Sequence, residues 1–205
     1  YYHGLGVPKD KSLTVHWYRK AADQGLTSAQ FYLGRSYYLG EGIPKDYQTA
    51  REWFRMAGEK GHAMAQLLLG YMHNFGQSVP KNPEKAVEWF RKAAEQGEKD
   101  AQYSLANAFL TGRGVSKDFA EAFKWYEKSA YQGNVKAQSA LGAMYLIDKE
   151  LIPNRITGMM WLTIAKSAGE KTAERNWNKM AAEMTAAEIA KAEKMAEDWK
   201  KKNGK

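Results

Sequence analysis

Tryptophan recurs in this chain at a constant interval of 36 residues. Five of the seven tryptophans follow that interval, namely Trp17, Trp53, Trp89, Trp125 and Trp161. Glycine keeps the same spacing from Gly25 to Gly169, and alanine keeps it from Ala29 to Ala173, so no insertion has shifted the frame. A unit of this length cannot bury its own apolar face, and successive copies must therefore stack on one another.

The first half of each copy predicts a helix, which we name helix A. In the second copy, Ala29, Leu33 and Tyr37 lie at i, i+4 and i+8, which is the spacing of one helical face. Gly40 follows as a terminator that can adopt positive φ. We therefore expect helix A over about residues 27–39.

The second half of each copy predicts another helix, helix B. Glycines and a proline in residues 40–46 break regular structure, and Asp46 can accept hydrogen bonds from the first amides of a new helix. Ala50, Trp53 and Phe54 then lie at i, i+3 and i+4 and form an apolar face. Each copy is thus a pair of antiparallel helices, and we expect the repeated tryptophans to pack in its core.

A small residue recurs inside helix A, where glycine is unfavourable by up to about 1 kcal/mol relative to alanine. We expect it to permit close approach of helix B. The four positions are Gly34, Gly70, Ala106 and Gly142.

The last copy departs from the pattern and leads into a different helix. Thr185 and Glu188 match a capping box, which is a helix start. A narrow apolar stripe follows on an otherwise charged segment, formed by Ile189, Ala192, Ala196 and Trp199. Because a terminal repeat needs a polar outer face, we predict a repeat array over residues 1–183 and a capping helix over residues 184–205.

The first copy begins late in the pattern. Tyr1 and Tyr2 stand in the register of Tyr37 and Tyr38, the end of a helix A. We expect a first repeat truncated at its amino end, with a leader peptide or further copies upstream. The apolar surface left there predicts more array or end-to-end self-association at that edge.

Composition narrows the classes of partner. The formal net charge is +8, but the turn lysines Lys45 and Lys117 are each followed by an aspartate, and further lysines lie at the carboxyl end. We therefore do not expect nucleic acid as the partner. No run approaches the roughly 20 apolar residues that span a bilayer, and without cysteine there is no disulfide or thiolate metal site.

The repeat resembles the Sel1-like repeat of bacterial proteins, a relative of the tetratricopeptide repeat. The matching motifs are A-Q-x-x-L-G at residues 29–34, G-x-G-I-P-K-D at residues 40–46, A-x-x-W-F at residues 50–54, and Gly61. The resemblance implies an all-α, right-handed α-solenoid with helix A lining its concave face. It also implies adaptor work between proteins in signalling, secretion or host contact, and it favours the bacterial periplasm or secretion over the cytoplasm.

The resemblance to tetratricopeptide repeats carries ligand-facing positions onto helix A. These predicted partner-binding residues are Phe31, Arg35, Tyr38, Leu67, Tyr71, Asn74, Tyr103 and Asn107. The same alignment also includes Leu39, Phe75, Leu110, Ser139, Ala143 and Leu146. Aromatic and arginine side chains are favoured at binding hot spots, and asparagine can hold a peptide backbone. The open alternative is that Phe31, Leu67 and Tyr103 fill gaps between adjacent copies.

We therefore predict a non-enzymatic scaffold that binds a peptide or helix of another protein, with no cofactor and no metal. His73 shares the register of Tyr37, Phe109 and Tyr145, so we interpret it as a packed aromatic substitute. One alternative is a cell-wall or β-lactam hydrolase or binding protein, because some cysteine-containing members of the family are reported to bind penicillin. The S-x-x-K spacing at Ser78 falls in a repeat turn and is interpreted as chance. A second alternative is RNA binding through stacked tyrosines.

Overall fold

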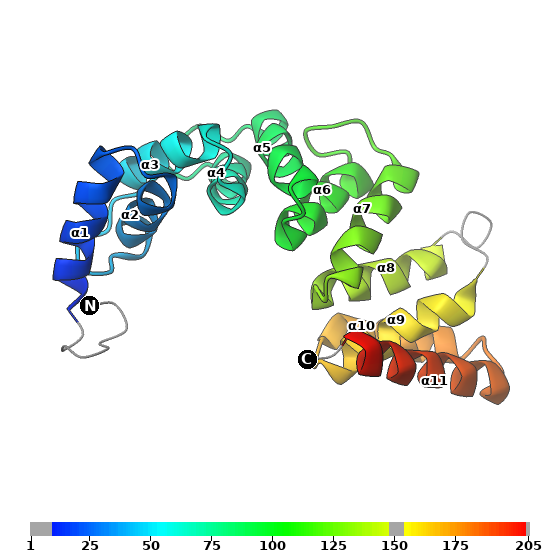
Figure 1. Ribbon diagram of the computed structural model, residues 1–205. Helices are drawn as coiled ribbons and strands as arrows, with labels where there is room; N and C mark the ends of the chain where they lie inside the picture. Colours follow the sequence, from blue (N-terminus) through cyan, green and yellow to red (C-terminus); the bar gives the residue numbers. More distant parts are fainter. Residues whose placement is uncertain (1–9, 148–153, 204–205) are drawn as a thin grey trace. The chain divides into compact units, whose positions relative to one another are not determined.

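The protein is all-α in the part that the computed structural model describes, residues 10–147 and 154–203. Figure 1 shows its helices in chain order. They are α1 (Lys11–Asp23), α2 (Thr27–Leu39), α3 (Tyr47–Glu59), α4 (Ala63–Phe75), α5 (Pro83–Glu95), α6 (Lys99–Thr111), α7 (Phe119–Tyr131), α8 (Val135–Ile147), α9 (Arg155–Ser167), α10 (Lys171–Ala181) and α11 (Ala186–Asn203). The even-numbered helices up to α10 are the A helices and the odd-numbered ones up to α9 are the B helices, as the repeat predicts.

The chain divides into two compact units. Unit 1 comprises residues 1–101 and 111–117, and unit 2 comprises residues 102–110 and 118–205. Within unit 1, α2 packs on α1 and α3, and α4 packs on α3 and α5. Within unit 2, α8 packs on α7 and α9, and α9 also contacts α10 and α11. The prediction of antiparallel helix pairs is confirmed.

The B helices begin at the predicted caps. The Asp46 side chain accepts hydrogen bonds from the amides of Gln48 and Thr49, at 2.9 and 3.2 Å. Asp10, Asn82, Asp118 and Asn154 cap the other B helices in the same way. The A helices α2 and α4 end at Gly40 and Gly76, which adopt the left-handed conformation. Local chemistry thus sets both ends of the repeat unit.

The small residues inside the A helices are sites of close helix approach, as expected. A Cβ added to Gly34 would lie 2.8 Å from Phe54 Cδ1, and one added to Gly70 would lie 2.4 Å from Phe90 Cε1. In unit 2, a Cβ on Gly142 would lie 2.6 Å from Leu162 Cγ. The helical penalty of glycine is therefore offset by closer packing of a large side chain on helix B.

The expectation that the repeated tryptophans pack in the core holds for two of the five. Trp125 and Trp161 are buried, but Trp53 and Trp89 are only half-buried and Trp17 is 49% exposed. The residue after the tryptophan is buried in four copies, as Phe54, Phe90, Tyr126 and Leu162, whereas Tyr18 after Trp17 is half-buried. In the copies with Trp53 and Trp89, the next residue packs against the small glycine of helix A, and the tryptophan lies at the edge of the apolar face. A lysine three residues later covers the indole in three copies, with Lys20, Lys92 and Lys128 at 4.9, 4.6 and 4.2 Å from the ring centroids of Trp17, Trp89 and Trp125.

Buried glutamines tie the A helices to the helices around them. Gln66 Nε2 donates to the Gly58 carbonyl at 2.8 Å, near the end of the preceding B helix. Gln96 Nε2, just after the following B helix, donates to Gln66 Oε1 at 2.7 Å. In unit 2, Gln132 Nε2 donates to Gln102 Oε1 at 2.8 Å. The repeated glutamine therefore satisfies carbonyls at helix ends that packing has removed from water.

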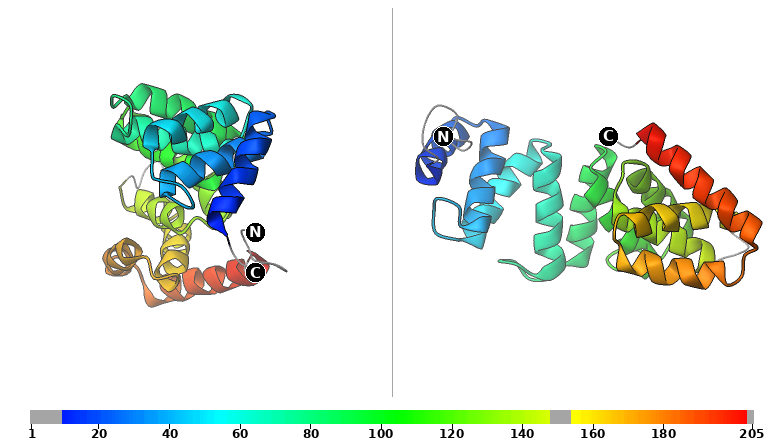
Figure 2. Two further views of the ribbon diagram at one scale, coloured as in Figure 1. Left: turned by 90° about the vertical axis from the view of Figure 1, so that its left-hand side faces the viewer. Right: turned by 90° about the horizontal axis from the view of Figure 1, so that it is seen from below.

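At the carboxyl end, α11 packs on α9 (Figure 2). Ala192 and Ala196 are buried, and Trp199 meets Trp161 edge-on with 5.4 Å between ring centroids. The capping box predicted for Thr185 and Glu188 forms, with the Thr185 amide donating to Glu188 Oε2 at 2.9 Å. The division into an array over residues 1–183 and a cap over residues 184–205 stays a prediction.

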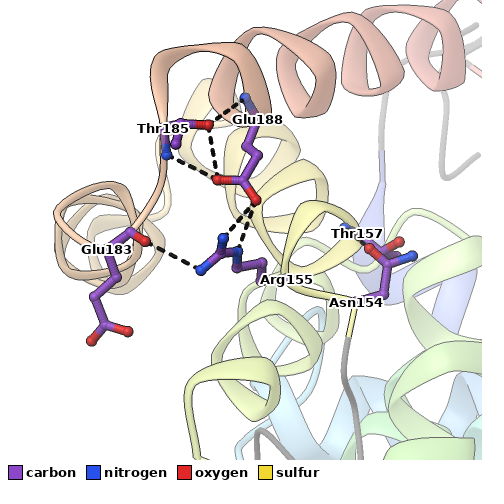
Figure 3. A network of polar contacts seen from close by, with 6 residues as sticks. All are labelled: Asn154, Arg155, Thr157, Glu183, Thr185 and Glu188. Atoms are coloured by element: carbon purple, nitrogen blue, oxygen red, sulfur yellow. Dashed lines mark hydrogen bonds and ion pairs between the residues drawn. The ribbon is translucent and has the colours of Figure 1, made fainter.

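Arg155 joins the start of α11 to the start of α9 (Figure 3). Its Nε and Nη2 donate to Glu188 Oε1 at 3.0 and 2.6 Å, and its Nη1 donates to the Glu183 carbonyl at 3.3 Å. The Thr185 hydrogen bonds, followed by those from Arg155, lower the pKa of the Glu188 carboxyl to about 2. Glu188 therefore caps one helix and fixes its position on another.

One expectation falls on residues that the structure does not describe. Tyr1 and Tyr2, on which the prediction of a truncated first repeat rests, lie outside the described ranges. Asn154, where the described part of the chain resumes, accepts from the Thr157 amide at 3.2 Å.

Candidate functional site

One side of α2 and α4 in unit 1 carries large side chains that the described helices leave partly uncovered. We define the A face as Tyr32, Arg35 and Leu39 of α2 with Leu68, Tyr71 and Phe75 of α4. On each helix these residues are spaced by three and four positions, so they share one side. Tyr32 is 42% exposed, Leu39 46% and Phe75 64%, whereas Arg35, Leu68 and Tyr71 are half-buried.

Side-chain contacts hold α2 and α4 beside each other. The Phe31 ring stacks on His62, which caps α4, with 4.3 Å between ring centroids. At the other end, the Tyr38 hydroxyl donates to Gln77 Oε1 at 3.0 Å. Both ends of the two helices are thus fixed, and the A face is built on rigid elements rather than on loops.

Phe31 and Leu67 do not present their side chains as expected. Phe31 is 8% exposed and Leu67 3% exposed. Each precedes an A-face residue, and a step of about 100° around the helix turns its side chain away from that face. The burial of these two side chains fits the gap-filling alternative.

The other unit 1 residues predicted to bind a partner are half-buried. Tyr71 packs edge-on against Phe90 and stacks with Phe75, with centroid distances of 5.3 and 6.2 Å. Tyr38 lies edge-on to Tyr47 at 5.1 Å. The Asn74 carbonyl accepts from Arg113 Nη2 at 2.9 Å. Of this group, Arg35 and Tyr71 belong to the A face.

The predicted residues of unit 2 are engaged within the protein. Asn107 Oδ1 accepts from the Tyr126 hydroxyl at 2.8 Å, and Asn107 Nδ2 donates to the Tyr103 carbonyl at 2.9 Å. Tyr103 itself is half-buried beside Tyr126. Burial raises the pKa of Tyr126 well above its usual value, which favours the neutral hydroxyl that donates to Asn107. Asn107 therefore serves the packing of unit 2.

Sequence reasoning missed Tyr32 and Leu68. Both follow from Arg35 and Tyr71 by a step of three residues back along the helix, so the helical period alone contained the signal. The alignment to tetratricopeptide positions selected the preceding residues Phe31 and Leu67 instead, which shifted part of the predicted surface by one residue.

Unit 2 carries a shallow hollow of about 290 Å³ at its A helices. Its lining consists of Tyr103, Lys136, Ser139, Ala140, Ala143, Glu170, Thr172 and Asn176. The hollow exists because small residues of α8 stand where α4 has leucine and tyrosine. Its lining thus combines polar side chains with alanines.

Glu170 organises the rim of that hollow. Its Oε2 accepts from Ser139 Oγ at 2.8 Å and from the Ala173 amide at 2.6 Å, so it also caps α10. Burial acts to raise the pKa of Glu170, but the hydrogen bonds from Ser139, Ala173 and Thr172 outweigh it and lower the pKa overall. The carboxylate is consequently held in its charged form.

Ser78, the serine of the S-x-x-K spacing, is part of the repeat turn. It adopts φ 56°, in the register of Gly42 at φ 74° and Gly114 at φ 75°. The Ser78 carbonyl accepts from Arg51 Nη1 at 2.9 Å, and the side chains of Ser78 and Lys81 are exposed. The positive φ is thus a property shared by the three copies whose turn the structure describes.

Two classes of site are not found where the structure can be read. Over residues 10–147 and 154–203, no three His, Asp or Glu side chains converge as a metal site would require. Among the same residues, no helix is both long and apolar enough to cross a bilayer.

The fold and the repeated core define a class: tandem helical hairpins with a glycine, alanine and aromatic register of 36 residues. The Sel1 repeat matches five consecutive segments, residues 1–26, 27–62, 63–98, 99–134 and 135–170. The chain belongs to the Sel1 repeat family.

Solved structures of bacterial Sel1 repeat proteins are similar to this chain. A Sel1 repeat protein from Oxalobacter formigenes superposes with a TM-score of 0.79 and 30% identity, covering 96% of this chain and 83% of that one. Cysteine rich protein B (hcpB) of Helicobacter pylori gives a TM-score of 0.52 and 25% identity, covering 65% of this chain and 96% of that one.

A third similar structure is c5321, a protective antigen present in uropathogenic Escherichia coli strains that displays the same fold. Its TM-score is 0.69 at 27% identity, and the match covers 98% of this chain. This chain spans 59% of the length of c5321. A comparison with curated protein sequences gives no match.

Proposed function

We propose that this protein is an interaction scaffold that binds a peptide or helix of another protein on the A face of α2 and α4. The observation that carries the proposal is the exposure of Tyr32, Leu39 and Phe75 on one side of two neighbouring helices. Large apolar side chains gathered on an exposed surface are typical of protein interaction sites.

The composition of the A face supports this function. Arg35 lies among Tyr32, Leu39 and Tyr71, and tyrosine and arginine are enriched among residues that dominate binding energy. The neighbouring aromatic contacts hold these side chains in place before a partner arrives. A preorganised surface loses less side-chain entropy on binding, which raises affinity.

The proposal extends to the location of the protein. The similar c5321 is a protective antigen of uropathogenic Escherichia coli, and an antigen that protects must be reachable by the host. We propose that this chain likewise acts in the periplasm or outside the bacterial cell, where the partner would be another secreted or surface protein.

Photo-crosslinking identifies the partner directly. A photoreactive phenylalanine analogue replaces Leu39 or Phe75 in the producing bacterium, and the same analogue at Trp17 provides a matched control. Trp17 is also an exposed apolar residue, 49% exposed, but it lies on α1 outside the A face. We expect one protein to be crosslinked from both A-face positions and not from position 17.

The purified partner is then titrated by calorimetry. Phe75→Ser and Arg35→Glu should each weaken binding at least about tenfold, which corresponds to the about 1.4 kcal/mol typical of a hot-spot residue. Trp17→Ala should leave the affinity unchanged. Equal binding by all three folded variants would reject the A face.

A further inference from the structure

A basic hollow of about 420 Å³ in unit 1 is lined by residues of α3, α4 and α5. Its polar and aromatic lining includes Arg51 and Arg55 of α3, His73 of α4, and Lys85, Glu88 and Trp89 of α5. This hollow is separate from the A face. Tyr71 and His73 are two residues apart on α4, which places them about 200° apart around the helix.

The hollow arises because two repeat positions that are apolar or aromatic in the other copies carry Arg51 in the second copy and His73 in the third. Arg51 stands where the other copies have Val15, Val87, Phe123 and Met159. His73 stands where the described copies have Tyr37, Phe109 and Tyr145. In unit 2 the equivalent pair, Phe123 and Tyr145, packs edge-on with 5.9 Å between ring centroids. An apolar contact has therefore been replaced by an arginine and a smaller imidazole.

The contacts of the arginines leave a positive charge inside the hollow. Arg51 uses Nη1 to bind the Ser78 carbonyl at 2.9 Å, which does not neutralise its charge. Arg55 pairs with Glu59, on its own helix and outside the lining, at 2.9 Å. Lys92, at the edge of the hollow, covers the Trp89 ring at 4.6 Å. Glu88 is the one carboxylate among the residues that line the hollow.

The pKa of His73 reflects its burial and the charges around it. Burial lowers its pKa first, and the positive charges of Lys85 and Arg51 lower it further, against an opposite effect of Glu88. His73 Nδ1 is buried and has no hydrogen-bond partner within the described residues. The lining holds more cations than anions, and this excess of like charge is unfavourable, so a negative group in the hollow would stabilise the arrangement.

We infer that the hollow binds a phosphate group, held by the Arg51 guanidinium, the Lys85 ammonium and the His73 imidazole. The planar guanidinium offers paired N–H donors to two phosphate oxygens, and lysine adds a compact positive charge. At about 420 Å³ the hollow exceeds a single phosphate, and Trp89 supplies an aromatic wall. The group that the hollow recognises is the phosphate. This group belongs either to free inorganic phosphate or to the phosphomonoester of a small organic molecule.

The test uses the intact chain and NMR of its histidine side chains. Inorganic phosphate and phenyl phosphate are added separately, and sodium chloride at matched ionic strength is the salt control. We expect a saturable change of the His73 resonances and a rise of the His73 pKa, since a bound anion favours the imidazolium. The exposed His16 should respond only as it does to chloride. Tighter binding of phenyl phosphate assigns the organic source, and equal or weaker binding assigns free phosphate.

Variants that introduce the residue found at the same position of another repeat should keep the fold and remove the hydrogen-bond donors of the hollow. Calorimetry should show binding at least tenfold weaker in Arg51→Val and His73→Phe, since valine and phenylalanine occupy these positions elsewhere in the array. Lys85→Gln, on the exposed part of α5, should also weaken binding and carries no packing change. Lys128→Gln in unit 2 should bind phosphate as the original chain does.

Three results would overturn the inference. The first is a His73 response no larger with phosphate than with chloride. The second is full phosphate binding by folded Arg51→Val and Lys85→Gln. The third is saturable binding of a glutamate-rich peptide together with no response to either phosphate, which would make the hollow a protein contact. None of these results bears on crosslinking from the A face, so the two proposals fail separately.

Discussion

Unit 1 and unit 2 expose different chemistry at equivalent positions of their A helices. In unit 1 these positions hold Tyr32, Arg35, Leu68 and Tyr71, whereas in unit 2 Ser104, Asn107, Ala140 and Ala143 occupy the same register. The buried positions nevertheless agree, since Leu33, Leu69, Leu105 and Leu141 all lie in the core. The comparison teaches that stacking constrains one side of helix A, while the other side is free to differ from copy to copy.

The largest expected effect tests whether the same close contact between helix A and helix B stabilises both units. Gly70→Ala and Gly142→Ala should each lower the free energy of unfolding by about 2 kcal/mol, because an added methyl group overpacks a close helix contact. The melting temperature should fall by about 4–8 °C for a chain of this size. Calorimetry of both variants measures it. Phe90→Leu should partly restore the stability of Gly70→Ala. A loss of stability in only one of the two glycine variants would contradict the conclusion that both units are packed in the same way.

The next effect asks what Asn107 does on the unit 2 side. Asn107→Ala removes the acceptor of the buried Tyr126 hydroxyl and should lower stability by about 1–3 kcal/mol. Tyr126→Phe alone should also destabilise, whereas Tyr126→Phe combined with Asn107→Leu should recover much of the loss. Urea unfolding followed by tryptophan fluorescence measures all three. Full stability of Asn107→Ala would return this residue to the set of partner-binding candidates.

A smaller effect separates turn geometry from a catalytic role of Ser78. Ser78→Gly relieves a left-handed conformation worth about 1–2 kcal/mol, and added freedom of the unfolded chain offsets about 0.4–1 kcal/mol of that gain. We expect a net gain of about 0.5 kcal/mol in the free energy of unfolding. The reverse change Gly42→Ser should destabilise, because its Cβ would lie 2.3 Å from the Lys11 carbonyl oxygen. Turnover of a chromogenic β-lactam that disappears in Ser78→Gly would contradict the architectural interpretation.

A pH-dependent effect concerns the end of unit 2. The folded pKa of Glu188 is about 2, below its ordinary value of 4.5, so its stabilising contribution is complete above pH 4.5 and is lost as the pH falls toward 2. Glu188→Gln should melt below the original chain at pH 7, and the difference should shrink between pH 4.5 and pH 2. Melting curves followed by circular dichroism measure it. A difference that does not change with pH would show that the carboxylate charge is not involved.

The smallest expected effect is on the A face itself. Phe75→Ser removes a side chain that is 64% exposed and should change the free energy of unfolding by less than about 0.5 kcal/mol. Thermal unfolding of this variant is also the control for its loss of partner binding. A large destabilisation would mean that Phe75 serves the fold, and the contrast between the two units would then lose its functional meaning.

Helix boundaries could be predicted because they depend on local chemistry. Asp46 and Asn82 begin helices by accepting from amides two or three residues ahead, and Gly40 ends one by adopting positive φ. The close contact at Gly34 could also be predicted, since an interior glycine in a helix requires a packing reason. Thr185 and Glu188 form a capping box within four residues of sequence, so no tertiary information was needed.

The exposed positions could be predicted only in part. The tetratricopeptide alignment included Arg35, Tyr71 and Phe75 of the A face, but it could not separate Phe31 and Leu67 from Tyr32 and Leu68. Consecutive side chains on a helix point in directions about 100° apart. The direction of the neighbouring helix therefore decides which of two adjacent apolar residues is covered. The same reasoning explains Trp53 and Phe54, two large aromatic neighbours of which only Phe54 is fully buried.

The sequence by itself determined the repeat, its two helices, their caps and the need for stacking, because these follow from period, glycine and capping chemistry along the chain. The tertiary structure decided which side chains remain accessible and which charges meet. Arg51 and His73 are 22 positions apart, and only the packing of α3 on α4 places them in one hollow. Contacts between helices depend on their relative orientation, and that orientation is a property of the packed units rather than of any single repeat.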